Sequence, residues 1–202
     1  MSDDAMKPDS GGPGPELRRP SGPRLLRRFR RAESGATAVE FGLVAMPFFM
    51  LLAAIVEMAL LLWTSQVLEE GVAQASRSLL TGQSQSLYKG SAAANTQAFR
   101  NAVCSSGTGL IDCTKLQIDV RTHTSFAAAQ TGTGSVVNGG ALNTAGFGYN
   151  QPQPNQIVVV RAVLEYPLFF TQWSSALADL TGGKRAIVAS STFRTEPFTI
   201  GN

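Results

Sequence analysis

Two carboxylates interrupt a long apolar run near the N-terminus. Glu40 lies at the start of the run and Glu57 lies deeper, and residues 41–56 between them carry no charge. A carboxylate inside a membrane is costly and usually has a partner. On one helix the two side chains would point about 100° apart, so they cannot share a site. Two interpretations of Glu57 stay open: a hydrogen bond to a neighbouring helix in an assembly, or a position near the outer membrane interface.

The chain has two cysteines, Cys104 and Cys113, and one histidine, His123. In an oxidising compartment a disulfide that closes this short loop is the favoured interpretation. The alternatives are two free thiols, or a metal site that includes the histidine. That array offers three ligands at most and lacks the close cysteine spacing typical of structural zinc. No residue pattern makes His123 a catalytic base. We therefore predict no metal, no cofactor and no enzymatic activity.

The charges of the 202-residue chain are unevenly distributed. Hydrophobic residues make up 44% and charged residues only 15%, which is low for a soluble globular protein. Residues 1–35 hold eight Lys/Arg and five Asp/Glu, whereas residues 36–202 hold nine of each. The net charge of +3 thus lies wholly in the tail. A basic tail of this kind is typical of a protein that is oriented in a membrane by its flanking charges. It is not typical of a domain with a nucleic-acid-binding face, so we predict no nucleic-acid partner.

The apolar segment 38–63 follows this tail. At about 1.5 Å per residue a helix of this length measures about 40 Å, which exceeds the roughly 30 Å of a hydrocarbon core. The positive-inside rule places the N-terminus in the cytoplasm. The arginines that determine this topology, and that would contact anionic lipid, are Arg24, Arg27, Arg28, Arg30 and Arg31. Pro47 cannot donate to the Leu43 carbonyl, so we predict a kink in the helix there.

These features divide the chain into three parts. Residues 1–35 are predicted to form a disordered, basic cytoplasmic leader, and residues 36–64 a transmembrane helix. Residues 65–202 would form an extracytoplasmic α+β domain. The helix is expected to continue into this domain, because apolar residues recur there at three- and four-residue spacing as far as Leu79. Gly82 is expected to end it.

The outer domain shows three strand patterns. Residues 116–124 alternate between apolar and polar types, residues 156–166 are rich in β-branched residues, and residues 186–194 form a weaker third strand. Short helices are predicted at 91–103 and 168–180. The Gly/Asn/Gln/Pro-rich stretch 127–155 is predicted to be a mobile, exposed loop. The expected fold class is α+β, with a small antiparallel sheet packed against the long N-terminal helix.

The stretch "SGATAVEFGLVAMPFFMLLAAIVEMALLLW" resembles the N-terminal segment of TadE-like proteins. These are pseudopilins of the tight-adherence (Tad or Flp) pilus, a relative of the type IV pilus. The shared features are Gly35 five residues before Glu40, the apolar helix that follows, Pro47, Glu57 and the sequence "VAQASR". The cysteine pair before a strand and "VVVRAVLEYPL" are similar as well. The strong resemblance covers about residues 33–80.

The resemblance implies that a prepilin peptidase cleaves on the cytoplasmic side after Gly35. Ala36 would then be the mature N-terminus, and the helix would be retained. We expect Glu40 to be recognised twice, first by this peptidase and then by a neighbouring subunit whose free N-terminal amine pairs with the carboxylate. Such a desolvated pair would fix the register between helices. The alternative keeps Glu40 at the interface, reaching towards lipid headgroups.

The resemblance further implies a minor pseudopilin with a pilin-like fold, anchored once in the bacterial inner membrane with its domain in the periplasm. Its role would be structural, in pilus biogenesis and hence in adherence and biofilm formation. The implied partners are other pseudopilins, assembly-platform proteins, the prepilin peptidase and membrane lipid. The alternative is an uncleaved bitopic anchor whose outer domain binds a ligand or envelope component through loop 127–155. Gly35 and Glu40 distinguish the two, because only a pseudopilin needs both.

Overall fold

The computed structural model of the chain describes residues 33–105, 109, 111–132, 134–172, 174 and 176–199. The chain divides into two compact units, Met1–Phe48 and Phe49–Asn202. In the first unit the described residues form the beginning of helix α2, Glu33–Leu80, and the rest of this helix belongs to the second unit. The five topology arginines of the predicted leader lie outside the described residues.

Helix α2 is long, and its second half is amphipathic as predicted. It continues through Pro47 without interruption, and the kink at this residue stays a prediction. The residues buried at three- and four-residue spacing are Leu68, Val72, Ala75 and Leu79. The helix ends shortly before Gly82, whose φ of 76° suits glycine. A Cβ at this position would also lie 2.3 Å from the ring of Phe198. A short helix α3, Ser84–Leu87, follows.

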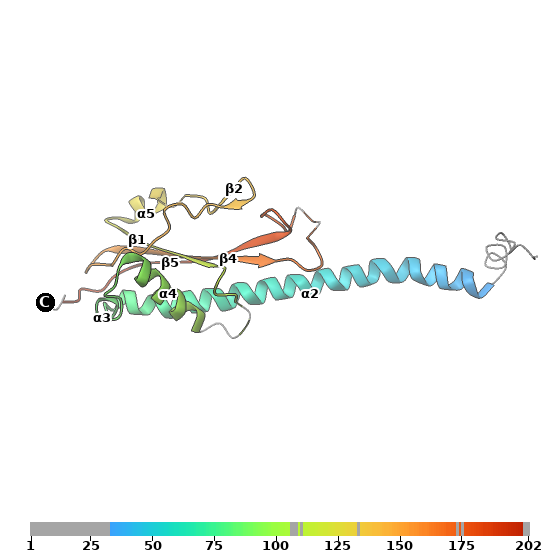
Figure 1. Ribbon diagram of the computed structural model, residues 1–202, viewed down its shortest axis with the longest axis horizontal. Coiled ribbons are helices and arrows are strands. Elements are labelled where there is room, and N and C mark those ends of the chain that lie inside the picture. The colour runs from blue at the N-terminus through green and yellow to red at the C-terminus, as the bar shows by residue number, and fades with distance from the viewer. Residues whose placement is uncertain are drawn as a thin grey trace, which may run out of the picture. The chain divides into compact units, whose positions relative to one another are not determined.

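The second unit contains a three-stranded antiparallel sheet in the order β1-β4-β5 (Figure 1). Its strands are β1 Leu116–His123, β4 Ile157–Pro167 and β5 Lys184–Arg194. All three predicted strands are therefore confirmed. Strand β4 is central, since Val160 pairs with Val120 on one side and with Ser191 on the other. A central strand covered on both faces explains the continuous β-branched run in its sequence.

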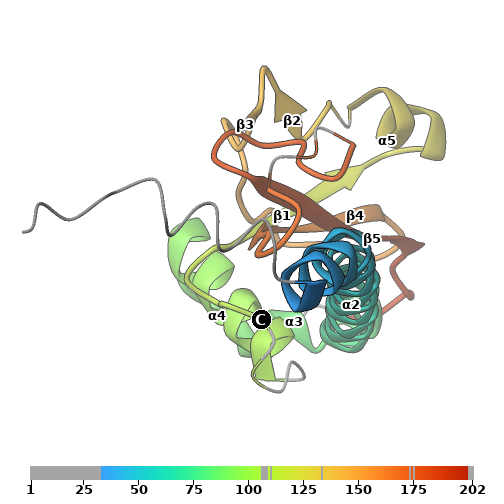
Figure 2. The same cartoon turned by 90° about the vertical axis from the view of Figure 1, so that its right-hand side faces the viewer.

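Helices cover both faces of this sheet (Figure 2). Helices α2 and α4, Ala92–Ser105, lie on one face, and α5, Phe126–Gly132, lies on the other. The residues of β4 that belong to the main core with α2 and α4 are Val158, Val160, Ala162, Leu164 and Tyr166. Ile157 and Val159 form a smaller core with Ala129 of α5. The predicted packing of the sheet against the long helix is thus present within the second unit.

The stretch 127–155 contains regular structure, although it was predicted to be a loop. It holds most of α5 and a two-stranded hairpin of β2, Val137–Asn138, and β3, Ala141–Leu142. Near its end, Tyr149 forms a parallel bridge with Val120 and is buried. The ring of Tyr149 contacts that of Tyr88 with 5.5 Å between centroids. The stretch is therefore attached to the core at its C-terminal end, and its mobility stays a prediction.

A buried carboxylate fastens this stretch to the sheet. Asp119 on β1 lies opposite Arg161 on β4, and their charged groups are 2.7 Å apart. Asp119 also pairs with Arg121 at 2.8 Å and accepts the backbone N–H of Gly148 at 3.2 Å. Arg121 in turn donates to the carbonyl of Gly146. The carboxylate thus has both cationic and backbone partners, which a fully buried charge requires.

Cys104 and Cys113 form a disulfide, as predicted from the sequence. Cys104 lies in the last turn of α4, and Cys113 precedes β1. Both are partly buried against the main core. The loop-entropy model assigns a bridge across so short a loop about 2–3 kcal/mol of stability. The bridge therefore ties the end of α4 to the start of the edge strand.

Gly71→Ala is expected to destabilise the second unit. Here α2 passes so close to α4 that an added Cβ would lie 2.8 Å from the carbonyl oxygen of Val103, a backbone atom. We expect the Tm of the full chain in detergent micelles, followed by circular dichroism, to fall by about 2–6 °C. Gly42→Ala on the same helix is the control, because nothing lies within 4 Å of its added Cβ. Equal Tm values for the two variants would contradict the close contact.

Candidate functional site

The start of α2 holds the predicted processing site and the first carboxylate. Gly35 is half-buried, and all residues from Ala36 to Glu40 are exposed. No element of the second unit is needed to form this stretch, because its helical hydrogen bonds are local. A peptidase or a neighbouring subunit would therefore meet these residues on the surface of the helix.

Large apolar side chains are exposed along much of α2. They have exposed fractions of 41–72% and are Val39, Phe41, Leu43, Val44, Met46, Phe48, Phe49, Met50, Leu51, Leu52, Ile55, Val56, Met58, Leu62 and Trp63. The helix is long and apolar enough to cross a membrane, as its composition predicted. An apolar surface of this extent is rare on soluble monomers and indicates contact with lipid or with other protein.

Glu57 is fully buried although it lies within this apolar part of α2. Its carboxylate accepts the backbone N–H groups of Phe169, Phe170 and Thr171 and the hydroxyl of Thr171. The Phe170 nitrogen lies 3.2 Å from both carboxylate oxygens. The nitrogen and Oγ1 of Thr171 lie 2.7 and 2.5 Å from Oε2. Four donors from one turn thus replace the water that this carboxylate loses on burial.

These hydrogen bonds determine the path of the chain after β4. Three successive backbone N–H groups at 169–171 point at one carboxylate, an arrangement in which consecutive N–H groups of a turn bind an anion. The helix predicted at 168–180 is wrong, because the described residues of this stretch form turns and irregular backbone. Trp173, which belonged to that prediction, lies outside the described residues.

Neither sequence-based interpretation of Glu57 included this partner. The turn lies more than a hundred residues away in the sequence, and residues 169–171 carry no charge. A search for a basic side chain or another helix therefore overlooks it. Backbone N–H groups are present at almost every residue and have no sequence signature. The observed partner is the chain's own outer domain, while the depth of Glu57 in a membrane stays a prediction.

The same turn exposes two aromatic side chains. Phe169 and Phe170 have exposed fractions of 59% and 55%. Tyr166, at the end of β4, contacts Phe169 edge to face with 6.3 Å between ring centroids. Burial, followed by the nearby charge of Glu57, raises the pKa of Tyr166, so its hydroxyl stays protonated at neutral pH. The turn thus combines a fixed backbone with an exposed, uncharged surface.

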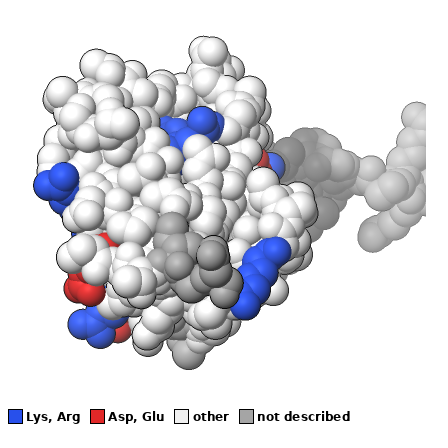
Figure 3. Space-filling model, turned by 90° about the vertical axis from the view of Figure 1, so that its left-hand side faces the viewer, with Lys and Arg blue, Asp and Glu red and all other residues white. Residues whose placement is uncertain are grey.

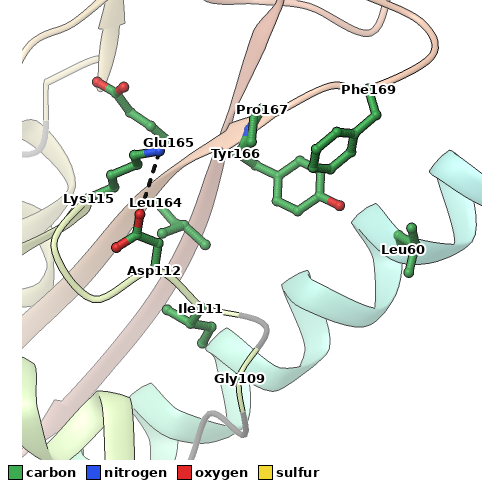
Figure 4. Close-up of a pocket in the computed structure, with 10 residues that line it drawn as sticks. All are labelled: Leu60, Gly109, Ile111, Asp112, Lys115, Leu164, Glu165, Tyr166, Pro167 and Phe169. Atoms are coloured by element: carbon green, nitrogen blue, oxygen red, sulfur yellow. Dashed lines mark ion pairs between the residues drawn. The ribbon is translucent and has the colours of Figure 1, made fainter.

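A groove of about 380 Å³ lies beside this turn (Figure 4). Its apolar lining is formed by Leu60, Ile111, Leu164, Tyr166, Pro167 and Phe169, and its polar lining by Asp112, Lys115 and Glu165. Lys115 and Asp112 form an ion pair at 3.5 Å. Hydrogen bonds from the hydroxyl and backbone N–H of Thr114 lower the pKa of Asp112. The groove therefore offers an apolar wall on the helix side and ionised groups at its other edge.

The end of the molecule seen in Figure 3 carries few charged side chains. Among the described residues visible there, Lys/Arg and Asp/Glu stand apart or next to groups of opposite sign, without a patch of one sign. A partner that bound this face would contact mainly uncharged surface.

Comparison with protein families gives a match within α2. Residues 35–77 match the family model TadE, described as TadE-like protein. The matched segment contains Gly35, Glu40, Pro47 and Glu57, so the resemblance seen in the sequence is confirmed over this segment. The sheet and α4 lie beyond it. Comparisons with curated proteins and with solved structures give no match.

Glu57→Gln is expected to loosen the turn at 169–171. Glutamine keeps one oxygen acceptor but turns an NH₂ donor towards the backbone N–H groups. Hydrogen bonds to a charged group are worth about 1.5–3 kcal/mol, so amide hydrogen exchange at these residues should accelerate at least about tenfold. The measurement is exchange followed by mass spectrometry on the full chain in nanodiscs. Glu69→Gln, at an exposed position of the same helix, is the control. Unchanged exchange in Glu57→Gln would contradict the role of the carboxylate.

Proposed function

We propose that this chain is a minor pseudopilin that acts in the assembly of a Tad (Flp)-type pilus. The observation that carries the proposal is the TadE-like match over 35–77. In support, this segment forms a helix with an exposed apolar surface, and a small α+β domain follows it. The proposed role is structural: the chain initiates or caps the filament, or engages the assembly platform in the inner membrane. Adherence and biofilm formation would follow from the pilus itself.

In this proposal the chain crosses the inner membrane once, with its N-terminus in the cytoplasm and residues 65–202 outside. The arginine-rich leader supports this direction through the positive-inside rule. The disulfide between Cys104 and Cys113 supports an extracytoplasmic domain, because such bonds persist in oxidising compartments. The orientation therefore rests on two independent features at opposite sides of the membrane.

Processing by a prepilin peptidase after Gly35 is the next step of the proposal. Cleavage would remove the leader and leave Ala36 with a free amine at the start of α2. The exposure of residues 36–40 supports access by an enzyme. After cleavage the remaining chain holds nine basic and nine acidic residues. The new N-terminal amine would then be the main positive charge near Glu40.

Glu40 is the proposed pairing group for a neighbouring pseudopilin. Among the large apolar side chains that surround it, a carboxylate is costly to insert into a bundle of helices without a partner. The N-terminal amine of an adjacent processed subunit supplies one, and the pair would set the axial register between the two helices. The exposed position of Glu40 supports a partner from outside the described chain.

Gly35→Ala is expected to abolish processing. The measurement is the N-terminal sequence of the protein recovered from native membranes, which should begin at Ala36 in the wild type. In the variant it should begin near Met1, because a side chain at position 35 obstructs the peptidase. Gly42→Ala, in open space on the same helix, should be processed normally. Intact chains in all three proteins would overturn the processed-pseudopilin function and favour the uncleaved membrane anchor.

Glu40→Gln is expected to weaken assembly of the processed protein. Breaking one partner of a buried pair costs about 3–5 kcal/mol, so the amount of processed chain that copurifies with other pseudopilins should fall at least about tenfold. The peptidase is also expected to recognise Glu40, so the variant could be cleaved less often. The copurified amount is therefore divided by the amount of processed chain, which separates a defect in assembly from a defect in cleavage. Glu69→Gln is the matched control on the same helix. Wild-type recovery of Glu40→Gln would contradict the pairing role.

A further inference from the structure

We propose that the turn carrying Phe169 and Phe170 is a second membrane-contact element, which inserts both aromatic side chains into the outer interface of the bilayer. The occupant of this surface is lipid, at the boundary between headgroups and acyl chains. The inference rests on the proposed function in one respect, namely that α2 crosses a membrane. It adds a role for the outer domain, which would then touch the membrane at a defined point.

The first argument is the exposure of the two side chains on a fixed backbone. Large apolar residues are usually buried, yet Phe169 and Phe170 are 59% and 55% exposed. Their backbone N–H groups are bound by the buried carboxylate of Glu57. The turn is therefore held in place by its backbone while its side chains remain at the surface. Insertion into lipid would cost little additional ordering of the chain.

The second argument is the depth at which this turn meets α2. The predicted membrane segment 36–64 ends seven residues beyond Glu57, which is about 10 Å along a helix. Interfacial apolar side chains lie about 5–10 Å deep at the boundary of headgroups and acyl chains, so hydrogen bonds to Glu57 hold Phe169 and Phe170 near the outer boundary of this segment. Trp63, 60% exposed on the same helix, lies less than two turns further on. Aromatic residues are favoured at this boundary.

The third argument is continuity of the apolar surface. Within the second unit, α2 exposes Ile55, Val56, Met58 and Leu62 in the turns around Glu57. Figure 4 shows the Phe169 turn alongside α2 near Leu60, and residues 168–172 carry no charge. The aromatic pair therefore extends the surface that the membrane would cover. This continuity favours lipid over a separate protein partner.

The test places a tryptophan at each position in the full chain, in a Trp63→Phe, Trp173→Phe background. The proteins are reconstituted in phosphatidylcholine–phosphatidylglycerol vesicles, with the phosphatidylcholine unlabelled or brominated near the carbonyl end of its acyl chains. For Phe169→Trp and Phe170→Trp, fluorescence in brominated vesicles should be at least about twofold lower, because interfacial side chains lie within reach of these bromines. Phe126→Trp is the matched control, since Phe126 on α5 is also 59% exposed. It should show no quenching.

Val44→Trp separates failure of this inference from failure of the proposed function. Val44 lies inside the proposed span, so lipid brominated towards the middle of the acyl chain should quench its replacement. Quenching at position 44, with positions 169 and 170 behaving like position 126, would overturn the membrane-contact role and leave the aromatic pair to a protein partner. Absence of quenching at position 44 would overturn the membrane span and, with it, both proposals.

Discussion

The second unit depends on one desolvated carboxylate. Glu57 has no contact with solvent, and a buried carboxylate without donors would cost several kcal/mol. Its donors are three consecutive backbone N–H groups and a hydroxyl, all from the turn that follows β4. Because the donors belong mostly to the backbone, helix and turn cannot shift past one another without losing several bonds together. The central strand of the sheet is thereby fixed to the helix at its end.

Much of this architecture could be predicted because it follows from side-chain periodicity. Alternation in 116–124 and the β-branched run in 156–166 predict strands, since each places apolar residues on a face that the core must cover. The three- and four-residue spacing that includes Leu68 and Leu79 predicts the buried half of α2. The two cysteines allow only one pairing within the chain. The segment that begins with Gly35 and Glu40 could be recognised by its resemblance to TadE-like proteins.

Two kinds of contact could not be predicted. One is made by backbone groups, and the other depends on how two strands are aligned. The partner of Glu57 is mainly a set of backbone N–H groups, and these have no sequence signature because almost every residue has an N–H group. Apolar residues near Phe169 favoured a helix, but the described residues of 168–180 form turns and irregular backbone. Asp119 is one of the polar residues of the alternating stretch 116–124. Its burial follows from Arg161 lying opposite, which becomes evident only once β1 and β4 are aligned.

The strand order has a consequence for the timing of folding. Strand β1 has one neighbour in the sheet, β4, and the whole of the stretch 127–155 is synthesised between them. As the chain is made, the backbone of β1 therefore has no strand of this sheet to pair with until β4 is synthesised, although α2, α4 and both cysteines already exist. These earlier elements can pack against the apolar face of β1 in that interval. The N-terminal half of the domain would therefore have to cover the edge strand β1 until the central strand β4 has been synthesised.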